Sequence, residues 1–194
     1  MMDTVILASQ SKGRLELLEK EGIPIITLPA DIDETIPWID PDAEIKGLAE
    51  KKALACHAQH PEHPEKWIIA ADTLVVFRGK PIGKPADIEE AKAFLEALSG
   101  KVHTVISGVA FLDRTTGRLY SASDVSEVHF KTLSKDDIED YLATGEWQGA
   151  AGAYRIQHKG NALVEKTVGS FSNIIGLPLS KLFNIMHDAG YPAD

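Results

Sequence analysis

One aspartate interrupts the most apolar stretch of the chain, and its position is the first indication of chemistry. The run 67–77 reads WIIAADTLVVF, a nearly continuous apolar pattern that predicts a central strand. Burying a carboxylate is costly unless it is paired, protonated or bound to a cation. Asp72 therefore binds a divalent metal or takes a proton from water, or else it is a buried structural hydrogen-bonding group.

A basic turn near the N-terminus is a second candidate site. Residues 5–18, VILASQSKGRLELL, predict a strand, a turn and a helix capped by Ser11. Lys12 and Arg14 fall in the first helical turn, where the helix dipole favours acidic side chains. Either a phosphate binds there, because serine hydroxyls, backbone N–H groups and basic side chains converge on it, or the turn is simply solvated. The Walker A spacing is absent.

Two lysines elsewhere in the chain could supply positive charge to a phosphorylated ligand. Lys52 falls on the apolar stripe of a helix predicted over 42–58, so its ammonium group either snorkels to solvent or reaches into a cleft. Lys84 stands between Gly83 and Pro85 in a stiff, exposed connection.

Two segments raise the question of a metal site. The connection 31–35, DIDET, contains three carboxylates including Glu34, which either help to bind a hard cation or form an acidic surface loop. In the segment 56–63, CHAQHPEH, Cys56 and His60 would be one helical turn apart. However, Pro61 breaks the helix and the spacing matches no closed zinc pattern.

The region 145–160 is rich in glycine, which lets a backbone approach a ligand closely but also serves in tight turns. Within it, Gln157 could read the edge of a base through its amide. His103 stands alone in a predicted strand, and we interpret it as structural.

The elements that must position these residues include both strands and helices. A strand is predicted at 23–28, and the segments 101–113 and 118–133 predict two long strands joined by a hairpin turn. Helices are predicted to begin at Ser11, Asp87 and Ser134, and another helix ends the chain.

Composition narrows the classes of function. The chain has 194 residues, 44% of them hydrophobic, which is enough for one core or for two small lobes that share a cleft. A net charge of −9 argues against a nucleic acid polymer as partner and favours a small phosphorylated ligand in a local basic pocket.

No run is long enough to span a membrane and no signal peptide is evident. With Cys56 as the single cysteine, we expect a cytoplasmic protein.

Four segments in order resemble motifs of the Maf family of nucleoside triphosphate pyrophosphatases. Residues 7–18 look like its L-A-S-x-S-P-R-R-x-E-L-L, and 71–73 look like its A-D-T. Residues 83–85 match its G-K-P, and 169–179 look like its G-S-[YF]-x-N-[VI]-[VI]-G-L-P-L. The resemblance covers nearly the whole chain and implies a single domain over 1–194.

The resemblance implies a mixed α/β fold, with an elongated twisted sheet flanked by helices and two lobes around a cleft. It also implies hydrolysis of a nucleoside triphosphate to the monophosphate and pyrophosphate with Mg²⁺ or Mn²⁺, commonly by a homodimer. By position, Asp72 matches the proton acceptor, and Glu34 with Asp72 matches the metal site. The substrate-binding set that it implies is Ser9, Lys12, Gly13, Arg14, Lys52, Thr73, Lys84 and Gln157, of which Thr73 and Gln157 match positions tied to base specificity.

The chain departs from the family pattern at two positions. Gly13 replaces an arginine that is tied to specificity, and Ala150 replaces a lysine. Thr73 and Gln157 fit the branch that resembles dTTP/UTP pyrophosphatases, so pyrimidine triphosphates are the expected substrates. The alternatives are a house-cleaning enzyme for modified nucleotides and a non-catalytic nucleotide sensor that regulates septum formation.

Overall fold

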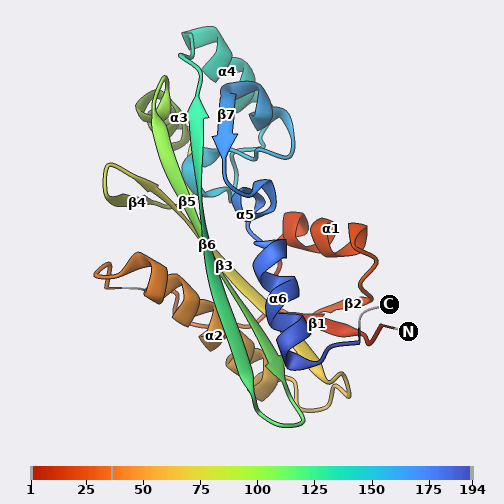
Figure 1. The fold of residues 1–194 in the computed structure, drawn as a ribbon. Coiled ribbons are helices and arrows are strands. Elements are labelled where there is room, and N and C mark those ends of the chain that lie inside the picture. The colour runs from red at the N-terminus through yellow and green to blue at the C-terminus, as the bar shows by residue number, and fades with distance from the viewer. Residues whose placement is uncertain (1, 36, 193–194) are drawn as a thin grey trace. The chain divides into compact units, whose positions relative to one another are not determined.

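A computed structural model describes residues 2–35 and 37–192, and Figure 1 shows its fold. Two compact units can be recognised in it. Unit 1 comprises Met1–Thr73, Ser107–Asp124 and Gly176–Asp194, and unit 2 comprises Leu74–Ile106 and Val125–Ile175. Each unit is therefore assembled from segments that are far apart in the sequence.

The described strands pair in one mixed sheet. Their order is β2-β1-β3-β5-β6-β7, and β4 pairs with β3. β1 is parallel to β2 and β3, whereas β7 is antiparallel to β6. A mixed sheet with helices confirms the α/β fold class expected from the sequence. The strands are β1 (Val5–Leu7), β2 (Ile25–Thr27), β3 (Trp67–Phe77), β4 (Lys80–Ile82), β5 (Val102–Asp113), β6 (Leu119–Phe130) and β7 (Val164–Val168).

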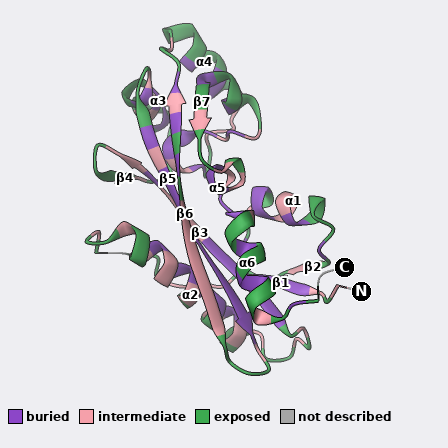
Figure 2. Ribbon diagram, in the orientation of Figure 1, coloured by how far each residue is buried: buried purple, intermediate pink, exposed green. Residues whose placement is uncertain are grey.

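In unit 1 the strands are apolar on both faces because helices cover both faces. Val5 belongs to a buried cluster with Leu18 and Met186, which lie on α1 and α6. The next residue, Ile6, points to the opposite face and joins a cluster with Ala53 of α2. Figure 2 shows β1 and much of β3 buried, as this arrangement requires. The helices of unit 1 are α1 (Lys12–Lys20), α2 (Pro41–Gln59) and α6 (Leu179–Ala189).

Side-chain caps set the starts of several helices, as the sequence predicted. Ser11, Asp87 and Ser134 each accept a hydrogen bond from the backbone N–H three residues later. The cap of α2 is Asp40, so this helix begins at Pro41, one residue before the predicted start. Proline suits that position because it lacks an N–H that would otherwise be unpaired.

Unit 2 has its own core, in which helices pack on the parts of the long strands that belong to this unit. Leu95 of α3, Phe130 of β6 and Tyr141 of α4 belong to one buried cluster. Two elements of this unit were not predicted from the sequence: β7, whose segment VEKTV is short and carries two charges, and the five-residue helix α5. Of the helices in the described ranges, none combines the length and apolar character needed to cross a bilayer. The helices of unit 2 are α3 (Ile88–Leu98), α4 (Lys135–Ala143) and α5 (Phe171–Ile175), with 3-10 turns η1 (Ala151–Ala153) and η2 (Lys159–Leu163).

A glycine in β5 permits a close approach of α2 to the sheet. A β-carbon added at Gly108 would lie 2.4 Å from the carbonyl oxygen of Ile45 and 2.8 Å from the backbone nitrogen of Lys46. Both neighbours are backbone atoms of α2, which cannot rotate away as a side chain can. The absence of a side chain at Gly108 therefore sets the distance between helix and sheet.

We expect Gly108→Ala to lower the free energy of unfolding by about 1–3 kcal/mol, because the added methyl group must push α2 away from β5. Gly47→Ala is the matched control, since a β-carbon at this position of α2 meets nothing within 4 Å. That variant should instead gain about 0.5–1 kcal/mol from its higher helix propensity. Urea unfolding of both variants measures the difference, and equal stability of the two would contradict the packing described.

Candidate functional site

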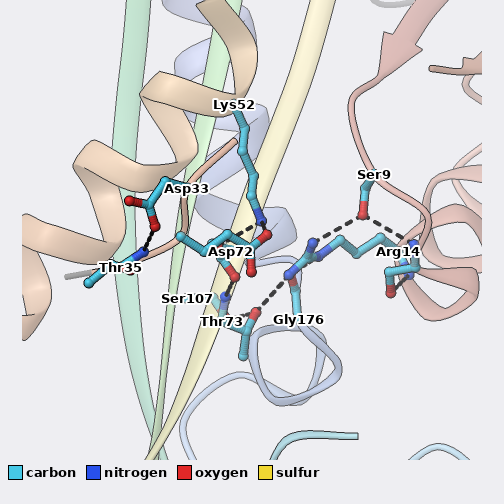
Figure 3. Close-up of polar contacts among 11 residues, drawn as sticks. Ser9, Arg14, Asp33, Thr35, Lys52, Asp72, Thr73, Ser107 and Gly176 are labelled. Atoms are coloured by element: carbon cyan, nitrogen blue, oxygen red, sulfur yellow. Dashed lines mark hydrogen bonds and ion pairs between the residues drawn. The ribbon is translucent and has the colours of Figure 1, made fainter. Parts of the chain in front are cut away.

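The aspartate of the apolar run is paired in the structure. Lys52 Nζ donates to one carboxylate oxygen of Asp72 at 2.7 Å, and the backbone N–H of Thr73 donates to the other at 2.7 Å (Figure 3). The Asp72 side chain is 14% exposed, so it keeps a small opening to solvent. The carboxylate is thus held in a fixed orientation and remains accessible to a small ligand or water.

Lys52 joins two carboxylates. Besides Asp72, its ammonium group contacts a carboxylate oxygen of Glu34 at 2.5 Å. Lys52 is buried, whereas the Glu34 side chain is 53% exposed. Of the two alternatives left open by the sequence, snorkelling to solvent is excluded. The lysine is a buried counter-ion between an exposed and a nearly buried carboxylate.

Arg14 is the second buried cation of unit 1, and it is held by neutral groups. Its Nε donates to the carbonyl oxygen of Gly176 at 2.8 Å and its Nη1 donates to Ser9 Oγ at 3.1 Å. Burial lowers the pKa of the Arg14 guanidinium, and the negative charges of Asp72 and Glu34 oppose this shift. An arginine nevertheless stays protonated in a protein, so a full positive charge is buried in unit 1.

Two residues near Arg14 were not predicted from the sequence. Ser107 is completely buried, and its hydroxyl lies 2.9 Å from Thr73 Oγ1. Gly176 offers its carbonyl oxygen to Arg14 Nε. Gly176 belongs to the segment 169–179, which carries part of the family resemblance and could have indicated from the sequence that Gly176 lies at the site. For Ser107 the only indication was a hydroxyl within the apolar part of β5.

The residues present fit a magnesium-type site with few protein ligands. Glu34 and Asp72 converge on one cation, the Lys52 ammonium group. Within the described ranges, no group of three or more His, Cys, Asp or Glu side chains could hold a metal. Mg²⁺ commonly takes one or two carboxylates and fills its other positions with phosphate oxygens and water. Glu34 and Asp72 thus suit an ion that also binds phosphate.

The Cys/His segment does not provide a metal site. Cys56 is buried, and its Sγ donates to the carbonyl oxygen of Leu28 at 3.4 Å. Burial raises the pKa of this thiol to about 11, so it stays protonated and is a poor metal ligand. The loop after α2 is held instead by Arg114, which donates to the carbonyl oxygens of His60 and His63.

Comparison with known proteins assigns the family. A family model described as "Maf-like protein" matches residues 4–189. The chain belongs to the Maf family.

Three relatives are named dTTP/UTP pyrophosphatase. The protein from Pelotomaculum thermopropionicum is 38% identical over 98% of both chains. That from Caldicellulosiruptor saccharolyticus is 40% identical over 98% of this chain and 96% of its own, and that from Desulfitobacterium hafniense is 44% identical over 90% and 80%.

Three other predicted residues of this Maf protein lie in the turn that leads into α1. Ser9 is buried, and its Oγ accepts hydrogen bonds from Arg14 and from the backbone N–H of Ser11. Lys12 is exposed, and the described residues offer it no ion pair. Gly13 is buried in the first turn of α1. The turn thus presents one anchored cation and one free cation.

Two predicted residues lie in unit 2. Lys84 is exposed in the connection after β4, and the backbone N–H of Gly152 donates to the carbonyl oxygen of the preceding Gly83 at 3.1 Å. Gln157 is half-buried in the turns before η2. Neither side chain has a hydrogen bond or ion pair with another described residue. Both therefore retain their full capacity to bind a ligand.

His103 has a structural role, as its lone position in the sequence indicated. It is 2% exposed, and its Nε2 lies 2.7 Å from the hydroxyl of Tyr154. Nδ1 has no hydrogen-bond partner in the described part of the chain. Burial lowers the pKa of His103 to about 4, and the nearby His129 acts in the same direction. The ring is therefore neutral near neutral pH.

We expect His103 to make the protein less stable in mild acid. Below about pH 6.5 the unfolded chain takes up a proton that the folded protein refuses, so stability falls as the pH drops from about 6.5 to about 4. The loss from this residue should be about 2 kcal/mol at pH 5. Urea unfolding at pH 7.5 and pH 5 measures it. Between pH 7.5 and pH 5, the free energy of unfolding should fall by about 2 kcal/mol less in His103→Gln than in the wild type. An equal fall in both proteins would refute the prediction.

Proposed function

We propose that this Maf family member hydrolyses nucleoside triphosphates to nucleoside monophosphates and pyrophosphate, with dTTP and UTP as preferred substrates. The observation that carries the proposal is the carboxylate pair of Glu34 and Asp72, held by Lys52 close to the buried cation Arg14. Relatives that are 38–44% identical and named dTTP/UTP pyrophosphatase support the same reaction and the same bases.

Asp72 is the group that would take the proton from the attacking water. Its carboxylate is fixed by two hydrogen bonds, and an ionised carboxylate can accept more than two. A fixed base within reach of a water molecule needs no reorganisation before it accepts the proton. Asp72 therefore combines a set orientation with remaining acceptor capacity.

Arg14 and Lys52 are the groups that would bind phosphate oxygens in unit 1. The Arg14 guanidinium has five N–H donors, and its planar fork matches the geometry of a phosphate. Fixed positive charges stabilise the negative charge that develops on the leaving pyrophosphate. Lys12, Lys84 and Gln157 have no partners among the described residues, and we assign them to further contacts with the nucleotide.

Glu34 and Asp72 are the residues that would hold Mg²⁺ or Mn²⁺. When bound, the ion neutralises part of the triphosphate charge and orients its oxygens. Without a nucleotide, the charges of the site already balance, because two carboxylates face Lys52 and Arg14. Lys52 must give up its carboxylate contacts when it turns to a phosphate.

The family resemblance also supports our proposals for assembly and specificity. We propose a cytoplasmic homodimer in which residues 1–194 act as one functional domain, without a nucleic acid or membrane partner. The net charge of −9 is consistent with a small anionic substrate that binds only at a local basic site. Gly13 in place of the family arginine removes one charge from the expected substrate contacts and is the feature that bears most on base preference.

The reaction is tested with a panel of normal and modified nucleoside triphosphates, scored for pyrophosphate release with Mg²⁺ or Mn²⁺. We expect dTTP and UTP to be hydrolysed fastest. Asp72→Asn should lower turnover by at least about 10²-fold, since general-base assistance is typically worth that much. Asp188→Asn removes a carboxylate from an exposed position on α6 and should leave turnover unchanged.

Each other outcome of this panel is informative. A folded Asp72→Asn protein with full turnover would refute the role of Asp72. Preference for modified nucleotides would identify a house-cleaning enzyme, and tight binding without turnover would identify a nucleotide sensor. Circular dichroism and unfolding of every variant exclude loss of the fold as the cause.

The metal assignment predicts that removal of Lys52 improves binding of the ion alone. In Lys52→Met the two carboxylates lose their internal counter-ion, and we expect Mn²⁺ without nucleotide to bind about tenfold more tightly than in the wild type. Lys51→Met is the matched control, because Lys51 is the exposed neighbour on α2 and should leave affinity unchanged. Electron paramagnetic resonance of free Mn²⁺ measures the affinity. Unchanged or weaker binding in Lys52→Met would contradict a site at Glu34 and Asp72.

A further inference from the structure

The anchoring of Arg14 leaves part of its guanidinium free. Nε donates to the carbonyl oxygen of Gly176 at 2.8 Å, Nη1 to Ser9 Oγ at 3.1 Å and Nη2 to Thr73 Oγ1 at 3.1 Å. Three of the five N–H donors are therefore used by the fold, and one donor remains on each terminal nitrogen. All three acceptors are uncharged. The orientation of the guanidinium is fixed, while its charge stays available for an anion (Figure 3).

The hydroxyl of Thr73 is fully engaged inside the protein. A guanidinium can only donate, so Thr73 Oγ1 must accept from Arg14. The same oxygen lies 2.9 Å from Ser107 Oγ and donates to the carbonyl oxygen of Gly176 at 3.3 Å. A hydroxyl has one donor and two acceptor sites, and these three partners account for all of them. The hydroxyl of Thr73 is thus bound on all sides within unit 1.

Ser107 supports Thr73 from the neighbouring strand. β3 and β5 are adjacent in the sheet, and Ser107 is completely buried between them and their packing partners. A buried hydroxyl that loses its partner costs about 1–3 kcal/mol, so the contact between Ser107 and Thr73 is strongly favoured. This contact restricts the rotation of the Thr73 side chain and therefore the position of the oxygen that receives Arg14.

Gly176 closes the same cluster from the C-terminal part of unit 1. Its φ of +120° is a conformation that residues with a side chain rarely adopt. A β-carbon there would lie 3.1 Å from Thr73 Oγ1 and 3.4 Å from Arg14 Nε. The glycine thus lets its carbonyl oxygen accept from both Arg14 and Thr73 at once.

We propose that Ser107 is a positioning residue that acts through the Thr73 hydroxyl on Arg14, and that this relay sets the guanidinium toward the phosphates of any bound nucleotide. The proposal rests on the hydrolytic function proposed above. The relay acts on the phosphates, which are common to all nucleoside triphosphates. Loss of the Ser107 hydroxyl should therefore affect every nucleotide by the same factor.

The test compares Ser107→Ala and Thr73→Val, which remove one hydroxyl each, with Thr73→Ser, which keeps it. We expect the first two to lower kcat by about tenfold or more, because a misplaced charged group loses contact with the reacting phosphate. In Ser107→Ala the fall should be equal for dTTP, UTP and CTP, so that the ratios between nucleotides stay as in the wild type. Thr73→Ser should restore most of the rate.

Ser126→Ala is the matched control for the loss of a buried serine hydroxyl. Ser126 is 2% exposed and binds Asn173 and Ser170 in unit 2. It should lose stability as Ser107→Ala does and yet keep the wild-type kcat. If kcat falls equally in both variants, Ser107 has only a structural role and the proposal fails. It also fails if Ser107→Ala changes the ratio of dTTP to CTP, or if Ser107→Ala keeps full activity.

A second measurement separates this proposal from the proposed function. Inorganic pyrophosphate binding is followed by calorimetry, and the Nε–Hε resonance of Arg14, assigned by its absence in Arg14→Lys, is followed by NMR. In Ser107→Ala and Thr73→Val we expect weaker pyrophosphate binding and a shifted Arg14 resonance, even if the wild type hydrolyses none of the nucleotides tested. Unchanged binding together with an unchanged resonance would overturn the relay whatever the reaction is.

Discussion

The ion pair between Lys52 and Asp72 is the interaction on which the rest of the site depends. Neither charge could be buried alone at a tolerable cost, because an isolated ion in an apolar interior loses its hydration without compensation. Their contact at 2.7 Å lets a long apolar strand carry a carboxylate in its middle. Glu34 adds a second negative charge from an exposed loop. The lysine therefore contacts one carboxylate that is nearly buried and one that is open to water.

Close packing of α2 on the sheet makes this ion pair possible. Ile45 touches the backbone position of Gly108, and Lys52 follows two helical turns later on the same face of α2. Small residues such as Ala49 and Ala53 line that face and leave room for the lysine to reach β3. The backbone contact at one glycine thus determines where a charge is placed seven residues further along the helix.

The buried charge of Arg14 is compensated in a different way from that of Lys52. Lys52 is neutralised by direct contact, whereas Arg14 is held by a carbonyl oxygen and two hydroxyls and feels the carboxylates only at longer range. A cation with fixed geometry and no carboxylate in direct contact is suited to an anion that arrives from outside. For the proposed hydrolysis of triphosphates, unit 1 thus offers one cation in contact with the carboxylates and one held by uncharged groups.

Much of the fold could be predicted because it depends on local patterns. The apolar run 67–77 corresponds to β3 at both ends, and Ser11, Asp87 and Ser134 cap helices, since each pattern involves neighbours along the chain. The types and order of the site residues, and with them the family, were also evident from the sequence. β7 was missed because it has only five residues and its two charged residues interrupt the apolar pattern, although its two valines and its threonine favour a strand, which forms by pairing with β6.

The sequence by itself therefore determined most of the elements and most of the residues that are available for chemistry. Only the tertiary structure decided how those residues pair. Lys52 binds carboxylates in the structure, Thr73 binds Arg14, and Ser107 and Gly176 join the site from other segments. Arg14 and Gly176 are 162 positions apart. No periodicity along the chain encodes such a contact, because it arises from the packing of the whole of unit 1 and from the need to satisfy every buried charge and hydroxyl.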